Sequence, residues 1–461
     1  MLPIFILVLL LFILITLIII TYKVNAKKAG IEGVKTGFIQ AQNYVYASIV
    51  LVSLAMVATL YIILQGTIWQ AHLMEWMNII VRLMHITFGI AWIGASFYFV
   101  FLENALNRTE NVREELAGNL WAVHGGGFYY LEKYKVAPKA IPKHLHWFKF
   151  EAYFTWVTGF CLLFIVYYFN AAALLIDKNI LNILPWQAVS IGVGSFIVAW
   201  IIYDLLCRYV MPKSKVLFMA SGLLLICVFA IFYTHVFSAR AAYIHFGAML
   251  GSIMAANVFF VIIPSQKAMV QAAKLGKPLN AQLGKNAGLR SLHNNYFTLP
   301  VLFVMISNHF PSTFGYKNSW LILLLISVGV AGVKHYLNVR EQGKISVWVM
   351  PVSILILLSA AYISAPPKPG VCKEDVSFAE VNKIVQLRCI SCHSAKPTDD
   401  VYKAAPNGVM YDTPEEIVKY KDKIMERAVV TKTMPLNNKT NITEAERDAL
   451  RCWISQGAAV K

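Results

Sequence analysis

Charged side chains are scarce in this chain. They make up 14% of its 461 residues, whereas hydrophobic residues make up 58%. Soluble globular domains carry about 25% charged residues, so the composition excludes a soluble multidomain protein. It predicts a polytopic membrane protein.

Acidic residues are the rarer charged class, and the formal net charge is +17. The positive excess is uneven. From residue 371 onward the chain has 14 Lys and Arg against 13 Asp and Glu, whereas the preceding apolar part has 27 against 11. Positive charge in the loops of an apolar region is a topology signal. We therefore expect a lipid membrane, and no nucleic acid, as a partner.

Apolar runs of about 17 to 25 residues predict membrane-spanning helices. Ten such runs occur, and Pro300 interrupts the eighth. The first has no basic residues ahead of it, which favours an uncleaved helix over a secretory signal peptide. The runs cover residues 2–22, 44–64, 78–102, 152–169, 187–206, 216–237, 242–263, 294–310, 319–336 and 347–363.

The loops between these runs differ in their basic residues. One alternating set carries 21 Lys and Arg, in residues 23–43, 103–149, 207–215, 264–293 and 337–346. The opposite set, in residues 65–77, 170–186, 238–241 and 311–318, carries only Lys178, Arg240 and Lys317. The positive-inside rule places the first set in the cytoplasm and both chain ends outside.

Cysteine is also scarce, with seven residues, yet two of them stand in the sequence Arg388-Cys389-Ile390-Ser391-Cys392-His393. A C-x-x-C-H sequence is the attachment signal for c-type haem, because two thiols bond to the porphyrin and the adjacent imidazole reaches the iron. The alternatives are a reduced thiol pair or half a zinc site. No second C-x-x-C and no H-x(3-5)-H follows, so we predict a covalent haem c with His393 as an axial ligand.

A proline-rich linker, residues 365–370, separates the apolar part from residues 371–461. We predict that the latter form a small periplasmic cytochrome c domain. Ser377 with Glu380, and Thr443 with Glu446, are spaced as capping boxes at the start of two helices, 377–385 and 443–456. A third helix is predicted over 413–428.

The second axial ligand is predicted to be Met434, because a downstream thioether raises the reduction potential of an electron carrier. Met410 and Met425 are the alternatives, and core packing is the simpler role for them. Cys372 and Cys452 stand near the ends of this domain, where they either form a disulfide or remain buried thiols. The remaining cysteines are interpreted as packing residues: Cys161, Cys207 and Cys227.

Histidines inside apolar runs are candidate haem ligands, since polar groups in hydrocarbon tend to be functional. His85 lies in the third run and His245 in the seventh. Both lie in the predicted periplasmic half, as do His235 and His309. His85 and His245 are therefore candidate ligands of a haem b. The alternative for each is a hydrogen-bonded histidine within the bundle.

Two clusters lie on the predicted cytoplasmic side. His124 precedes three glycines, residues 125–127, which either approach an anion through their backbone amides or form a tight turn. Arg290, His293, Asn294 and Asn295 stand at the predicted mouth of the eighth helix. They concentrate the hydrogen-bonding groups that a planar polar heterocycle requires. A capped helix start with a topogenic arginine is the alternative.

Four stretches carry a family resemblance: residues 82–99, 124–129, 144–149 and 293–300. Together they resemble the membrane-bound urate oxidases, or urate hydroxylases, bacterial proteins that fuse an eight-helix membrane domain to a C-terminal cytochrome c. Together with the ten apolar runs and the loop charges, the resemblance predicts an all-α fold, a polytopic bundle of about ten helices with both ends outside. Residues 1–68 add two helices to a membrane domain at 69–364. The first stretch is also similar to the membrane protoporphyrinogen oxidases, whose corresponding histidine is associated with haem.

The resemblance implies oxidation of urate, or a related purine, to 5-hydroxyisourate in the bacterial inner membrane. Electrons would pass through haem c to a respiratory acceptor such as a terminal oxidase or a soluble cytochrome. As hypotheses, Arg290 with Asn294 or Asn295 holds the substrate, and His124 or His293 accepts a proton. The alternative function is a cytochrome c subunit of a respiratory complex without urate chemistry.

Overall fold

The computed structural model describes residues 36–64, 67–138, 140–142, 144–344, 346–365, 371–372 and 375–460, together with Leu10 and Ile13. The predicted first span, its interpretation as an uncleaved helix and most of the proline-rich linker lie outside the described residues. The chain divides into two compact units, Met1–Ile79 and Ile80–Lys461. Helix α2 (Thr36–Leu64) belongs to the first, and α3 (Ile68–Ala105) continues from the first into the second.

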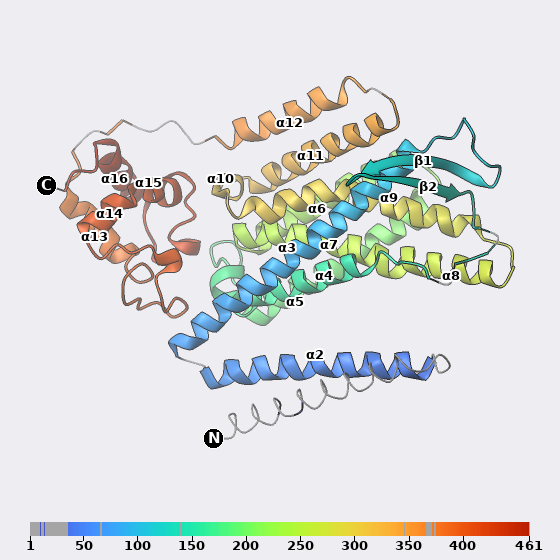
Figure 1. The fold of residues 1–461 in the computed structure, drawn as a ribbon. Coiled ribbons are helices and arrows are strands. Elements are labelled where there is room, and N and C mark those ends of the chain that lie inside the picture. Colours follow the sequence, from blue (N-terminus) through green and yellow to red (C-terminus); the bar gives the residue numbers. More distant parts are fainter. Residues whose placement is uncertain are drawn as a thin grey trace. The chain divides into compact units, whose positions relative to one another are not determined.

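The rest of the apolar part is a bundle of long helices (Figure 1). Within the described residues, six segments are long and apolar enough to cross a membrane: His72–Ala105, Phe150–Tyr168, Pro185–Val210, Lys215–Val236, Ala239–Lys274 and Ser319–Glu341. The helices of the bundle are α4 (Phe150–Leu163), α5 (Pro185–Leu205), α6 (Lys215–Val236), α7 (Ala239–Ala256), α8 (Ile263–Lys274), α9 (Ala281–Ser307), α10 (Pro311–Phe314), α11 (Ser319–Glu341) and α12 (Val349–Ile363).

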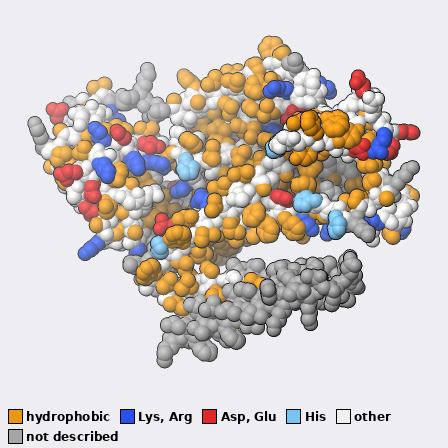
Figure 2. All heavy atoms as spheres, in the orientation of Figure 1, with side chains coloured by type: hydrophobic (Ala, Val, Ile, Leu, Met, Phe, Trp, Pro, Cys, Tyr) orange, Lys and Arg blue, Asp and Glu red, His pale blue; other side chains and the backbone are white. Residues whose placement is uncertain are grey.

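The outer surface of the bundle is apolar. Figure 2 shows hydrophobic side chains over its middle, and charged side chains gathered over the C-terminal helices and near the β-hairpin. Leu83, Leu224 and Leu355 are exposed large apolar residues. In water such a surface would be an aggregation hazard, whereas in a bilayer it contacts lipid. The chain is therefore a multi-pass membrane protein.

Several helices change to π-helical winding within the bundle. The segments η1 (Phe164–Tyr168), η3 (Leu206–Val210) and η4 (Asn257–Ile262) continue α4, α5 and α7, and η2 (Ala171–Leu175) follows η1. π-Helical turns are rare in proteins overall, and those that occur are often found at functional sites. Two of them, η3 and η4, adjoin the buried polar residues described below.

One feature corrects the all-α prediction. Strands β1 (Leu116–His124) and β2 (Gly127–Tyr134) pair antiparallel, with His124 opposite Gly127. Gly125 and Gly126 have φ of 58° and 80°, and positive φ at both central residues is what a two-residue hairpin turn of the primed type requires. The glycine run is thus the tight turn, and the sequence analysis missed the hairpin because it considered only the turn.

A second correction concerns α9. The sequence placed its start at residue 294, but the helix begins at Ala281, where the Asn280 side chain accepts a hydrogen bond from the Gln282 amide. The polar cluster from Arg290 to Asn295 therefore lies inside the helix, not at its mouth. Hydropathy missed the first turns because their polar side chains interrupt the apolar run.

The C-terminal segment has its own hydrophobic core, which includes Val381, Val385, Leu450 and Trp453. Its elements are α13 (Phe378–Arg388), η5 (Pro406–Gly408), α14 (Pro414–Lys419), α15 (Lys421–Ile424), η6 (Met425–Val430), η7 (Leu436–Asn438) and α16 (Glu444–Ser455). The predicted middle helix at 413–428 is thus divided among α14, α15 and η6.

Two predictions about the ends of this segment are now resolved. The Ser377 and Thr443 side chains cap α13 and α16, and Thr443 forms the full capping box with Glu446. Cys372 and Cys452 form a disulfide, one of the two alternatives for this pair. Closing a loop of 80 residues restricts the unfolded chain and stabilises the fold by roughly 4–5 kcal/mol in the chain-entropy model.

Candidate functional site

The residues of the C-x-x-C-H sequence lie in a single turn at the end of α13. The amides of Cys392 and His393 both donate to the Cys389 carbonyl, at 3.2 and 2.9 Å. His393 Nδ1 is 2.9 Å from the Val409 carbonyl, and the Tyr411 ring lies 5.3 Å from its imidazole. A ring that is held through Nδ1 leaves Nε2 available to bind iron, which is the usual arrangement of a metal-binding histidine.

Met434 lies in the segment between η6 and η7. Its amide donates to the Arg427 carbonyl, and its carbonyl accepts a bond from the buried guanidinium of Arg447 at 2.8 Å. Arg447 also donates to the Ala428 carbonyl. Arg447 of α16, which the sequence analysis did not single out, therefore fixes the backbone of the proposed second ligand. The donor set of two thiols, an imidazole and a thioether suits a haem c.

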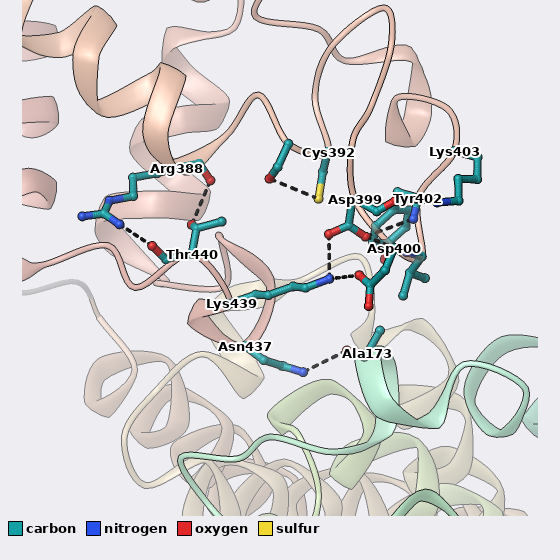
Figure 3. A network of polar contacts seen from close by, with 12 residues as sticks. Ala173, Arg388, Cys392, Asp399, Asp400, Tyr402, Lys403, Asn437, Lys439 and Thr440 are labelled. Carbon is teal, nitrogen blue, oxygen red and sulfur yellow. Dashed lines mark hydrogen bonds and ion pairs between the residues drawn. The ribbon is translucent and has the colours of Figure 1, made fainter.

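A charged cluster lies beside Cys392 (Figure 3). Lys439 donates to Asp399 at 2.6 Å and also to Asp400, and Asp399 accepts from the amides of Val401 and Tyr402. Burial alone would raise the pKa of Asp399, but the Lys439 ammonium and these amides outweigh it and hold the pKa at about 2. The carboxylate is thus fully ionised at neutral pH.

The C-terminal segment contacts the turn that follows α4. The side-chain nitrogen of Asn437 donates to the carbonyls of Ala173 and Ile176, both at 2.9 Å. Figure 3 shows the bond to Ala173. The Asn179 side chain returns a bond to the Asn437 carbonyl. These contacts join the C-terminal segment to the predicted outer loop at 170–186.

His85 packs against α4. Its Nδ1 lies 3.0 Å from the Thr155 carbonyl and 3.2 Å from the Thr158 hydroxyl. A Cβ on Gly159 would lie 2.8 Å from the imidazole, so only glycine admits the ring there. Within the described residues Nε2 makes no hydrogen bond, and the residues fit an imidazole that could ligate a haem.

His245 is enclosed differently. It is completely buried, its Nδ1 is bonded to the Ala241 carbonyl, and its Nε2 lies 3.1 Å from the Tyr168 hydroxyl. Aromatic rings surround it, the closest being Phe237 at 4.5 Å between ring centroids. Both ring nitrogens are occupied, which does not fit a haem ligand. His85 contacts Gly159 of α4, whereas His245 contacts Tyr168 of η1, nine residues further along the chain, or roughly 13 Å along a helix.

A network of buried side chains surrounds Arg290. Its guanidinium donates to Asp204 at 2.5 Å and to Asn257 at 3.1 Å, and stacks over the Tyr203 ring. Asn257 donates to the Tyr203 hydroxyl and to Asn294, whose own amide donates to the Met254 carbonyl. With His293 this set forms the Arg290 network: Tyr203, Asp204, Asn257, Arg290, His293 and Asn294.

His293 completes that network. Its Nδ1 lies 2.8 Å from the Tyr203 hydroxyl, and its ring stacks on Phe218. Because the hydroxyl oxygen already accepts from Asn257, we assign its proton to the bond with His293, which places the imidazole proton on Nε2. Nδ1 is therefore occupied in this arrangement.

Asn295 points into a second cluster. Its amide donates to the Ser96 hydroxyl at 3.3 Å, and its oxygen accepts from Asn338 at 3.0 Å. One turn before Asn338 on α11 stands Lys334, whose ammonium lies 3.6 Å from the centre of the Phe97 ring. These five residues, Ser96, Phe97, Asn295, Lys334 and Asn338, are called the Lys334 cluster below.

The structure thus separates the predicted substrate residues. Arg290, His293 and Asn294 share one network, Asn295 belongs to the other cluster, and His124 is exposed at the end of β1. The sequence analysis missed Asp204, Asn257 and Lys334. The signal that would have found Asp204 and Lys334 was a single charged residue inside an apolar run, since such residues tend to be functional.

Comparison with known families gives one match. A family model described as urate oxidase N-terminal matches residues 71–365, more than half of the chain. Every residue of the Arg290 network and of the Lys334 cluster lies within that range, and the C-x-x-C-H sequence lies beyond it. Neither a curated protein nor a solved structure matches the chain.

Proposed function

Because the chain belongs to the urate oxidase N-terminal family, we propose that it oxidises urate to 5-hydroxyisourate and delivers the electrons to a haem held by Cys389, Cys392 and His393. The observation that carries this proposal is the combination on one chain: the family match covers the bundle, and the hydrogen-bonded turn of the C-x-x-C-H sequence follows it. Soluble urate oxidation hands electrons to oxygen, whereas this chain offers its own electron outlet.

The chemistry is a two-electron oxidation. Urate and one water give 5-hydroxyisourate, two protons and two electrons, with the new C–O bond at C5 of the purine. A haem c accepts one electron at a time, so two transfers complete each turnover. The residues proposed from sequence to contact the substrate are His124, Arg290, His293, Asn294 and Asn295, of which His124 lies apart from the rest.

The electrons have to cross the bundle. The haem segment contacts Ala173 and Ile176, which precede α5, whereas Asp204 lies near the other end of that helix. The nineteen helical steps from Pro185 to Asp204 span about 28 Å. A haem b held by His85 would split the electron path across the bundle into two shorter steps. His85 is held through Nδ1, and its Nε2 makes no hydrogen bond within the described residues, which supports this assignment. His245 packs within an aromatic cage instead.

We propose the bacterial inner membrane as the location, with ten spans and the haem segment in the periplasm. The Cys372–Cys452 disulfide supports an oxidising compartment. The contact between Asn437 and the weakly basic loop 170–186 supports placing both outside. The proposed acceptor is a respiratory partner, a terminal oxidase or a soluble cytochrome.

Anaerobic addition of urate to the purified protein tests the function. Reduction of the haem c absorption band by urate, followed by recovery of 5-hydroxyisourate, is the expected result. Reduction only by a quinol analogue would instead support the alternative, a respiratory cytochrome subunit. A pyridine haemochrome of the same sample reports haem b, and its loss in H85A with haem c retained would identify the ligand.

A further inference from the structure

Lys334 carries a buried charge that forms no ion pair within the described residues. Only 2% of its surface is exposed, and no Asp or Glu in the described chain forms an ion pair with it. Its ammonium rests on the face of Phe97. A ring face offsets only part of the free energy lost when an ammonium leaves water, and Glu341, seven residues further along α11, acts on the charge only from beyond ion-pair distance, so the ammonium has no contacting counterion among the described residues.

Asn338 presents an unpaired acceptor next to this cation. It is four residues after Lys334 on α11, and residues at that spacing share one face of a helix. Its side-chain nitrogen donates to Asn295, but its buried Oδ1 has no hydrogen-bond partner among the residues that the structure describes. Buried acceptors are rarely left unpaired unless a ligand or water completes them. The cluster thus offers one free charge and one free acceptor on the same face.

These two groups define the ligand they suit. A small anion would pair with Lys334, and an N–H on the same molecule would donate to Asn338 Oδ1. Urate at neutral pH is a monoanion with carbonyl oxygens and several ring N–H groups, so it supplies both. The Arg290 guanidinium, by contrast, already pairs with Asp204.

We propose that the Lys334 cluster binds urate as its anion, with Lys334 pairing with the negative charge and Asn338 accepting a ring N–H. This inference rests on the proposed function for the identity of the anion. It assigns substrate recognition to α11 and to the Asn295 face of α9, and not to the Arg290 face.

Equilibrium binding of urate under anaerobic conditions tests the assignment in the full-length protein. K334M keeps the length of the side chain and removes its charge. We expect the Kd for urate to rise at least about 30-fold, as for loss of one partner of a buried charge pair, while the Kd for neutral hypoxanthine changes less than about threefold. K344M removes an exposed lysine beyond the end of α11 and should leave both values unchanged.

A second variant keeps Lys334 but gives its ammonium an ion-pair partner inside the protein. N338D places a carboxylate one turn from the ammonium, so an internal ion pair should exclude the ligand anion and also raise the Kd for urate at least about 30-fold. A structural role for Lys334 would not produce this loss, because the lysine is retained and gains a partner.

The outcomes separate this inference from the proposed function. If urate reduces haem c in the native protein but K334M and N338D bind urate normally, the inference is wrong and the function stands. If urate binding depends on Lys334 and no reduction follows, the binding site stands and the oxidation does not. A native protein that neither binds urate nor is reduced by it overturns both. Equal weakening of urate and hypoxanthine by K334M would also overturn the inference, because charge would not be what is recognised.

Discussion

The two polar clusters inside the bundle differ in how their charges are matched. In the Arg290 network the guanidinium pairs with Asp204 and Asn257, and the neighbouring amides and hydroxyl bond to one another. In the Lys334 cluster the ammonium contacts an aromatic face, and within the described part of the chain it has no carboxylate at ion-pair distance and Asn338 Oδ1 has no hydrogen-bond partner. Both clusters include residues of α9: Asn294 belongs to the Arg290 network and Asn295 to the Lys334 cluster.

This difference teaches what burial of a charge signifies. A buried ion pair with complete hydrogen bonding holds helices together, and removing one member leaves the other stranded. A buried charge without a partner lowers stability and is retained where a ligand completes it. The Arg290 network therefore has the character of a structural joint, and the Lys334 cluster that of a binding site.

Removing Arg290 should have the largest effect on stability. R290A removes the buried partner of Asp204 and leaves that carboxylate only the exposed Arg208, so we expect a loss of about 3 kcal/mol in the free energy of unfolding, seen as a lower melting temperature in detergent. R208A is the matched control, because Arg208 pairs with the same carboxylate but its side chain is 59% exposed. It should lose no more than about 1 kcal/mol. Similar losses in both variants would show that Asp204 is not desolvated, and the comparison would fail.

Removing Lys334 should have the opposite sign. K334M replaces an uncompensated buried ammonium with an apolar side chain of similar length, so we expect the free energy of unfolding to rise by about 1–3 kcal/mol. The measurement is again thermal unfolding without urate, with K344M unchanged. A melting temperature lowered as far as in R290A would make Lys334 another structural charge and remove the distinction between the clusters.

The Asp399–Lys439 pair adds a case outside the membrane part, where water reaches the lysine. The pKa of Asp399 is about 2, below its ordinary 3.8, so the pair stabilises the fold above about pH 4 and its contribution disappears as the pH falls to 2. Lys439 is half exposed, and we expect K439M to lose about 1–2 kcal/mol at pH 7 after allowing for screening and almost nothing at pH 2.

Acid titration of unfolding in K439M and the native protein measures that difference. K383M, at an exposed position on α13, is the control and should follow the native curve throughout. A loss in K439M that is the same at pH 2 and pH 7 would mean that packing of the lysine, and not its charge, is responsible.

Much of the fold followed from sequence because lipid imposes a simple requirement. A helix must present an apolar surface to the bilayer, so apolar runs located α5 and α6 closely and placed α3 with a start ten residues too late. The rule fails where polar side chains face inward, as in the first turns of α9, and where a segment leaves the membrane, as in the hairpin of β1 and β2. The caps at Ser377 and Thr443 followed from local spacing alone.

The sites were harder to predict because the folded structure, and not the local sequence, determines which side chains interact. Spacing alone predicts a haem attachment site at Cys389, Cys392 and His393, since that chemistry is local. It also grouped Arg290 with Asn295, although adjacent residues on a helix point in different directions. Whether a buried charge has an ion-pair partner depends on residues far away in the sequence. Arg290 pairs with Asp204, whereas Lys334 has no such partner among the described residues. A local sequence pattern does not contain that information.

His293 offers the smallest and most discriminating test of the comparison. The Tyr203 hydroxyl bonds to its Nδ1, and its ring stacks on Phe218. H293F keeps the stacking and loses one hydrogen bond, so stability should fall by about 1 kcal/mol. If the Arg290 network is a joint, urate-dependent haem reduction should stay within about threefold of the native rate. If instead reduction is abolished while the melting temperature and urate Kd are nearly unchanged, His293 is the proton acceptor that the sequence suggested. The substrate would then reach the Arg290 network, and charge matching would be a poor guide to where chemistry occurs in this bundle.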